Sequence, residues 1–311
     1  MSNFNETLMV QAALSRFQVF RLQLTTVVPQ PGGNPALKTP HLHAGVQAAR
    51  PAMVAANHPQ FNLPGAAGSG SSGNQPRPTG TPMPQPPALF KAASNDQADC
   101  DFQREVHDAY SNYIHQICRA ICLAHTEWKM TARFEGVMVN GISATGGRIV
   151  GSDLGGFIIA NGPSTGLFGN ASAWTRAIAK SIGDAWHEFM RNTTVPGLPW
   201  YPAFAAFPGP MAPPMPNVPT PMAALAYNLY TVSPMAIEQR IVCQMGTGEF
   251  VAELASAIAV AFSGAVSLWL PTQMVMLVMG KGPVPSFAPP YVPVGPVVGG
   301  DIISTPGHLM S

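Results

Sequence analysis

Apolar side chains recur every three or four residues in several stretches of the chain, a spacing that predicts amphipathic helices. The strongest stretch contains Phe102, Val106, Tyr113 and Trp128. Helices are expected at about 3–24, 102–128 and 170–191, after Ser233-Pro234, and at about 247–270. Asn3 or Asn5 can cap the first of these helices, and Ser233 with proline at the first helical position can cap the fourth.

Between the second and third predicted helices the pattern changes to short Val and Ile runs separated by glycines, as in "GVMVNGISATGGRIV". Such runs favour short strands joined by tight turns. We therefore expect short strands between about 134 and 162, including the run "FIIA". The predicted fold class is an α-rich α+β fold.

A long segment has little that could build a core. It includes "GAAGSGSSGNQPRPTGTPMPQPP" and is rich in Pro, Gly and Ser. This composition is typical of a flexible or extended linker. The sequence thus predicts an N-terminal helical region at 1–28, an extended arm or linker at 29–97, and a core at 98–311.

The core contains an apparent internal repeat. When Trp186 is aligned with Trp269, further matches follow: Val195 with Val278, Gly197 with Gly280, Phe204 with Phe287 and, with one residue of slack, "TGLF" (165–168) with "TGEF" (247–250). The predicted units, about 165–222 and 247–306, each hold a turn, a helix with a Trp, and a Pro-rich tail. Repeated units usually bury their apolar faces against neighbours.

The Pro-rich tails cannot donate a full ladder of hydrogen bonds, because proline has no N–H. They can lie across a groove as stiff, extended straps; the alternative is a disordered tail. The strap hypothesis makes Phe204 and Phe287 anchors in a neighbouring subunit. Trp128, Trp186 and Trp269 are the matching candidates for helix contacts at an interface.

The composition of the chain indicates that partners cover part of its surface. Charged residues make up 10% of the 311 residues and apolar ones 46%, with 33 Pro and 30 Gly. So few charges predict that much of the surface faces protein or lipid. The net charge is +1 and no Lys/Arg cluster is present, so a nucleic-acid partner is not expected. Four cysteines are too few for a disulfide scaffold, and the N-terminus lacks the pattern of a signal peptide.

The uncharged run 254–280 is long enough to cross a membrane. Pro271 interrupts it, and no basic cluster flanks it. We therefore favour a buried helix within a protein assembly. A membrane-anchored or membrane-active protein that uses 254–280 remains the alternative.

Two groups could carry chemistry. "GPSTG" (162–166) resembles the turn around a nucleophilic serine, but Ser164 has only His187 or the distant His308 as a base, without an acidic orienter. His115, Cys118, Cys122 and His125 share one side of a helix, but they spread too far along it to bind one ion. The sequence predicts that the cysteines fill a helix contact, and it predicts neither an enzyme nor a cofactor.

These patterns together predict a non-enzymatic structural protein of a multi-subunit particle, such as a virion, a phage-tail-like particle or a contractile injection machine. Its expected partners are copies of itself and other structural proteins of the particle, which would assemble in the cytoplasm. This class is chosen by analogy of design.

Overall fold

A computed structural model describes residues 3–19, 93–246, 248, 250–288 and 292–307. Within some elements, at 19, 93–104, 287–288 and 292, only the backbone is described. The chain divides into two compact units, Met1–Phe17 with Ala109–Ser311, and Gln18–Asp108. Most of the arm predicted at 29–97 lies outside the described residues. The domain boundaries from the sequence therefore stay a prediction.

The described residues form a mixed α+β fold with six α-helices and several short antiparallel strands. The helices are α1 (Glu6–Val19), α3 (Ala93–Thr131), α4 (Leu154–Asn161), α5 (Ala171–Arg191), α6 (Pro234–Met245) and α7 (Val251–Trp269). The strands are β1 (Arg133–Asn140), β2 (Ser143–Val150), β3 (Val195–Pro199), β4 (Phe207–Pro208), β5 (Met211–Pro216), β6 (Thr220–Pro221), β7 (Met274–Val275), β8 (Met279–Pro283), β9 (Phe287–Ala288), β10 (Val292–Gly295) and β11 (Asp301–Ile303).

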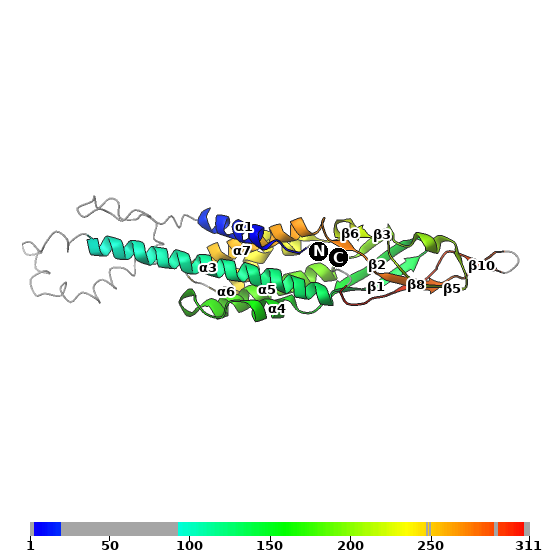
Figure 1. The fold of residues 1–311 in the computed structure, drawn as a ribbon, viewed down its shortest axis with the longest axis horizontal. Coiled ribbons are helices and arrows are strands. Elements are labelled where there is room, and N and C mark those ends of the chain that lie inside the picture. The colour runs from blue at the N-terminus through cyan, green and yellow to red at the C-terminus, as the bar shows by residue number, and fades with distance from the viewer. Residues whose placement is uncertain (1–2, 20–92, 247, 249, 289–291, 308–311) are drawn as a thin grey trace, which may run out of the picture. The chain divides into compact units, whose positions relative to one another are not determined.

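Helices and strands of the first unit are segregated. The helices lie side by side, and the strands gather beyond one end of them (Figure 1). The strands form small antiparallel sheets with the orders β1-β2-β3, β11-β8-β5, β4-β10-β9 and β6-β7. Two reciprocal backbone hydrogen bonds of 2.9 Å between Val139 and Gly300 connect the first two sheets. The C-terminal strands are therefore tied to the first hairpin.

The predicted helices are present, but α3 begins at Ala93, nine residues before the predicted start and inside the segment predicted as an arm. Residues 20–24 of the first predicted helix lie outside the described residues. Asn5 Oδ1 accepts from the Leu8 N–H at the start of α1. Ser233 caps α6, with Pro234 at the first helical position. The strand prediction is correct for β1 and β2 but wrong for "FIIA", which lies in α4. Asp153 explains the difference, because its carboxylate accepts from the N–H groups of Gly155 and Gly156 and so caps a helix.

Two glycines let the backbones of α4 and α5 touch. A Cβ on Gly155 would lie 2.8 Å from the Ala179 carbonyl oxygen, and one on Gly183 would lie 2.8 Å from the Gly155 nitrogen. Side chains of ordinary size would push the helices apart, so glycine at both positions sets their separation.

The Pro-rich segments pair with each other inside the chain. β5 pairs with β8, with Ala212 opposite Gly282, and β4 pairs with β10, with Pro208 opposite Val294. These backbone groups are already used within one chain. Within the described residues these segments therefore pair inside the molecule, and a strap across a neighbouring subunit stays a prediction.

Asn217 holds the loop between β7 and β8 in place. Its side chain donates to the carbonyls of Val218 and Val275 and accepts from the N–H of Val278, at 2.7, 3.0 and 3.0 Å. Tyr201 adds a hydrogen bond to the Val278 carbonyl, and its ring covers Gly280. Side-chain hydrogen bonds thus fix this loop, which has few regular backbone hydrogen bonds.

Asn217→Ala should lower the free energy of unfolding by about 2 kcal/mol, because it leaves the Val278 N–H and the Val275 carbonyl buried without these partners. Urea denaturation would measure the loss. Asn228→Ala, which removes a hydrogen bond at an exposed turn, is the control and should cost less. Equal losses in the two variants would contradict the role given to Asn217.

Candidate functional site

The aromatic residues predicted at interfaces lie inside the first unit. Trp128, Trp186, Trp269 and Phe204 are each no more than 2% exposed. The three tryptophans meet in one cluster, in which ring centroids are 5.0 Å apart for Trp128 and Trp186 and 5.7 Å for Trp186 and Trp269. Phe204 stacks on Tyr201 at 5.1 Å. These four residues are core residues of their own chain, and this corrects the prediction that they anchor neighbours.

The side chain of Phe287, the fifth predicted anchor, lies outside the described part of the structure. Its backbone is paired in β9, where Phe287 lies opposite Pro293 of β10. A surface that can meet a partner must therefore come from other residues.

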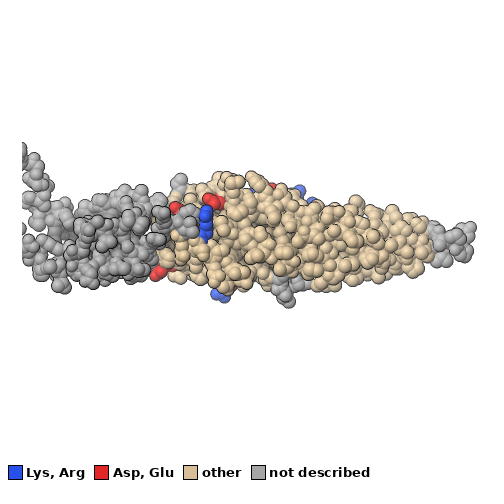
Figure 2. All heavy atoms as spheres, turned by 90° about the horizontal axis from the view of Figure 1, so that it is seen from above, with Lys and Arg blue, Asp and Glu red and all other residues tan. Residues whose placement is uncertain are grey.

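Such a surface covers the strand-bearing part of the first unit. The described strands carry charge only at Arg133, Glu135, Arg148, Lys281 and Asp301. No charged residue occurs from Asn192 to Pro221, where the strands β3 to β6 lie, or from Gly282 to Gly300. In Figure 2 this part of the face shown is almost free of charged side chains. We call it the uncharged surface.

Large apolar side chains are exposed across the uncharged surface. They are Met138, Ile142, Met211, Val218, Leu277, Val298 and Ile303. Single exposed apolar residues are ordinary, but many of them together without intervening charges are typical of an interaction site. The charges on the strands are paired: Glu135 lies 2.8 Å from Arg133 and 3.7 Å from Arg148, and Lys281 lies 3.9 Å from Asp301, which leaves one net positive charge.

Sheet edges on this surface are poor in hydrogen-bond donors. β3 reads "VPGLP" and β5 reads "MAPPMP", and each is the last strand of its sheet. Because proline lacks an N–H, these edges resist the addition of another strand. A partner is therefore expected to pack on side chains of the uncharged surface rather than to extend a sheet.

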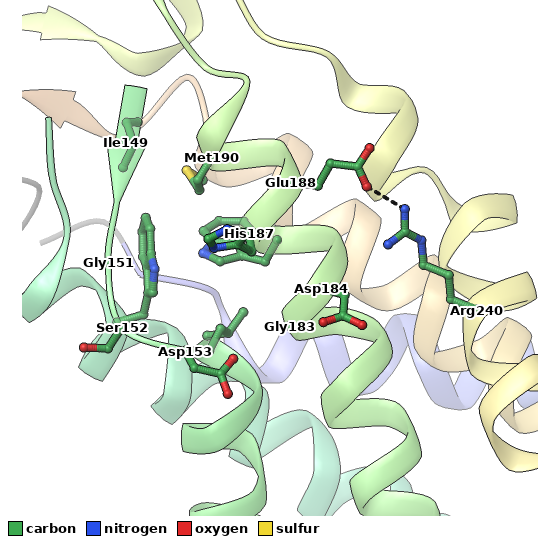
Figure 3. Close-up of a pocket in the computed structure, with 13 residues that line it drawn as sticks. Ile149, Gly151, Ser152, Asp153, Gly183, Asp184, His187, Glu188, Met190 and Arg240 are labelled. Carbon is green, nitrogen blue, oxygen red and sulfur yellow. Dashed lines mark hydrogen bonds and ion pairs between the residues drawn. The ribbon is translucent and has the colours of Figure 1, made fainter. Parts of the chain in front are cut away.

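A separate cavity of about 520 Å³ lies between the end of β2, the start of α4 and the helices α5 and α6. Figure 3 shows Ser152 and Asp153 on one side and Asp184, His187 and Glu188 of α5 on the other. The carboxylates are engaged: Asp153 caps α4, Asp184 pairs with Lys180 at 2.9 Å, and Glu188 pairs with Arg240 at 2.7 Å.

The hydrogen bonds of His187 bear on whether this cavity holds an activated serine. No hydrogen bond joins His187 to Ser152 or to an acidic residue among the described side chains, so no activated nucleophile is assembled. The described residues also contain no group of three His, Cys, Asp or Glu side chains that could hold a metal ion. The ion pairs here connect α5 to itself and to α6.

Ser164 lies in an exposed turn between α4 and α5, away from this cavity. A nucleophile elbow follows a strand, whereas the "FIIA" run before Ser164 is helical. His308 lies outside the described residues. The local context of Ser164 therefore differs from that of a hydrolase nucleophile.

The four candidate metal ligands on α3 are separated by burial. His115 is exposed, while Cys118, Cys122 and His125 are buried. Burial raises the pKa of Cys122 to about 12 and also raises the pKa of Cys118, so both thiols stay protonated at neutral pH. The Cys122 Sγ lies 3.8 Å from Met9 Sδ, in the contact between α3 and α1.

Helix α7 is the one described helix that is long and apolar enough to cross a membrane. In the structure, 67% of its most apolar window is buried against the rest of the chain. Length and composition alone do not separate a core helix from a spanning one.

Sequence reasoning missed the cavity and the enclosure of His125 by aromatic rings. The only sequence signal for the enclosure of His125 is the spacing that puts His125 and Trp128 on the apolar side of α3. Comparison with models of protein families, with curated proteins and with solved structures finds no match to this chain.

Proposed function

We propose that this chain is a non-enzymatic structural protein that assembles with copies of itself, and with other structural proteins, into a multi-subunit particle. The uncharged surface carries this proposal. Apolar side chains on several strands and loops are exposed there with few charges between them, and burial of such a surface between subunits is favourable. A particle of the virion, phage-tail-like or contractile injection type suits this design, with assembly in the cytoplasm.

An internal duplication is part of the same proposal. Phe168 and Phe250 both have left-handed backbone, with φ of 53° and 57°, just before α5 and α7. Both helices end near a tryptophan of the same cluster, and each is followed by short strands and a Pro-rich segment. These similarities support units at about 165–222 and 247–306, and duplication of a unit would give one chain two similar binding surfaces.

The alternative is a membrane-anchored protein that uses 254–280. The length and hydropathy of α7 favour it, but in this role α7 would have to leave its neighbours. Its buried residues include Leu254, Ile258 and Phe262, which would turn from protein to lipid. Extraction of the expressed protein by carbonate, without detergent, would contradict the alternative.

Charge placed on the uncharged surface should abolish assembly. Wild-type protein is expected to show a mass several times that of the chain by light scattering after size exclusion. Met211→Glu, at a position 59% exposed on β5, should reduce it to the mass of one chain, because burial of an unpaired carboxylate at an interface is costly.

Met235→Glu is the matched control. Met235 is also 59% exposed, but it lies in the first turn of α6, outside the strands. This variant should assemble like wild type. A monomeric wild-type protein at all concentrations, or equal loss of assembly in both variants, would overturn the proposed function.

A further inference from the structure

His125 lies in an enclosure of aromatic rings. It is fully buried and stacks on Phe4, with ring centroids 3.8 Å apart and planes 6° from parallel. Trp269 and Trp186 meet it edge-to-face at 4.9 and 5.5 Å. Neither ring nitrogen has a hydrogen-bond partner among the described residues. A neutral imidazole is tolerated in such a site, whereas a charged one would be left without compensation.

Glu6 of α1 raises the pKa of Cys118 and Cys122 on the same helix as His125, but no acidic group among the described residues contributes to the pKa of His125. Lys129, one turn further along α3, is the charged neighbour, and its charge disfavours a second positive charge. The side chains that α5 and α7 present are Trp186 and Trp269, and the N-terminal segment presents Phe4. Burial and Lys129 therefore hold the pKa of His125 well below 6.5.

Phe4 is the wall of this enclosure that the N-terminal segment contributes. It precedes α1, whereas the other walls belong to α3, α5 and α7. The N-terminal segment is held by a hydrogen bond of 3.1 Å from Lys129 Nζ to Asn3 Oδ1 and by one of 3.2 Å from Arg16 to Ser256 Oγ. Met9 and Phe17 add apolar contacts with α3.

We propose that protonation of His125 opens the N-terminal segment Asn3–Phe17 as a unit, so that this segment acts as an acid-sensitive cover over the helices of the first unit. Opening lets water reach the imidazolium without disturbing the packing of α4 to α7. It also uncovers Phe262 and Trp269, which Phe4 contacts in the closed form. Acid would thus expose an apolar part of α7.

The direction with pH follows from proton uptake. His125 has a lower pKa in the closed form than in the open form, so the open form binds the proton, and the closed form loses stability as pH falls below about 6.5. The pKa of Lys129 is lowered from 10.5 to about 8. Lys129 therefore changes the stability of the closed form between pH 10.5 and about 8. The loss of stability below pH 6.5 is assigned to His125.

Hydrogen exchange measured by mass spectrometry on the full chain tests this inference. After correction for intrinsic rates, protection of the α1 peptide should fall by up to about tenfold per pH unit between 6.5 and 5, because one proton is taken up on opening. Peptides from α5 and the middle of α7 should keep their protection. Loss of protection in α1, α5 and α7 together, or no change in α1, would overturn the proposal.

Three variants complete the test. His125→Phe should make α1 protection independent of pH from 7.5 to 5, and His115→Phe, at an exposed position of the same helix, should behave like wild type. Phe4→Ala, which removes one wall and leaves the helices intact, should lower α1 protection at least tenfold already at pH 7.5. An unchanged pH profile in His125→Phe, or wild-type protection in Phe4→Ala, would contradict the inference.

Discussion

Trp186→Ala is expected to lower the free energy of unfolding by about 3–5 kcal/mol, the range for a large aromatic removed from a core. Trp186 lies at the centre of the aromatic cluster, with ring centroids within 6.1 Å of six other rings. These rings belong to Phe4, His125, Trp128, Phe189, Phe262 and Trp269. Its loss would leave a cavity between the N-terminal segment, α3, α5 and α7.

Trp174→Ala is the control for this prediction. Trp174 is near the start of the same helix, α5, and is only half-buried. Its ring contacts Tyr110 of α3. Urea denaturation at pH 7.5 should show a clearly smaller loss for it. If both variants lose the same stability, the cluster around Trp186 is not the centre of the core.

Hydrogen bonds are unevenly distributed in this cluster: Trp269 Nε1 donates to Gln273 Oε1 at 3.1 Å, but two other members lack a bond within the described part of the chain. The Trp186 Nε1 and both nitrogens of His125 have no partner among the described residues. Packing and the edge-to-face ring geometry therefore hold Trp186 and His125 in place. Trp186→Phe should consequently be milder than Trp186→Ala, since it keeps an aromatic ring and removes an unpartnered N–H.

Local patterns predicted the helices well because helix signals are short-range. Apolar spacing located α3, α5 and α7, and Ser233-Pro234 marked the start of α6. The same approach failed at α4, because a short apolar run fits a buried strand or a buried helix equally well. Asp153, the residue that decides between them, acts as a cap that the apolar pattern does not register.

The candidate surface was only partly predictable. The low charge of the chain indicated that apolar surface would be left exposed, and exposed Met138 and Met211 agree with this. Which apolar residues remain outside depends on pairing between distant segments. Phe204 illustrates this limit: its sequence context suggests an external anchor, but long-range contacts with the chain around Val297 place it inside.

Gly183→Leu should lower the free energy of unfolding by about 3 kcal/mol, the upper end of the usual cost of overpacking. Gly183→Ala should also destabilise, although alanine normally stabilises a helix interior by about 0.5–1 kcal/mol relative to glycine. The reason is the contact with α4, where a Cβ on Gly183 would lie 2.8 and 2.9 Å from the backbone nitrogen and Cα of Gly155. Backbone atoms cannot move aside as a flexible side chain can, so α4 and α5 would have to separate.

Gly264→Ala is expected to have the opposite effect on stability. Gly264 lies inside α7, and a Cβ there would meet nothing within 4 Å. This variant should raise the free energy of unfolding by about 0.5–1 kcal/mol, because only the helix preference of alanine acts. Denaturant midpoints that shift in opposite directions for Gly183→Ala and Gly264→Ala would establish the contact between α4 and α5. Stabilisation by both substitutions would show instead that the two helices do not touch through their backbones.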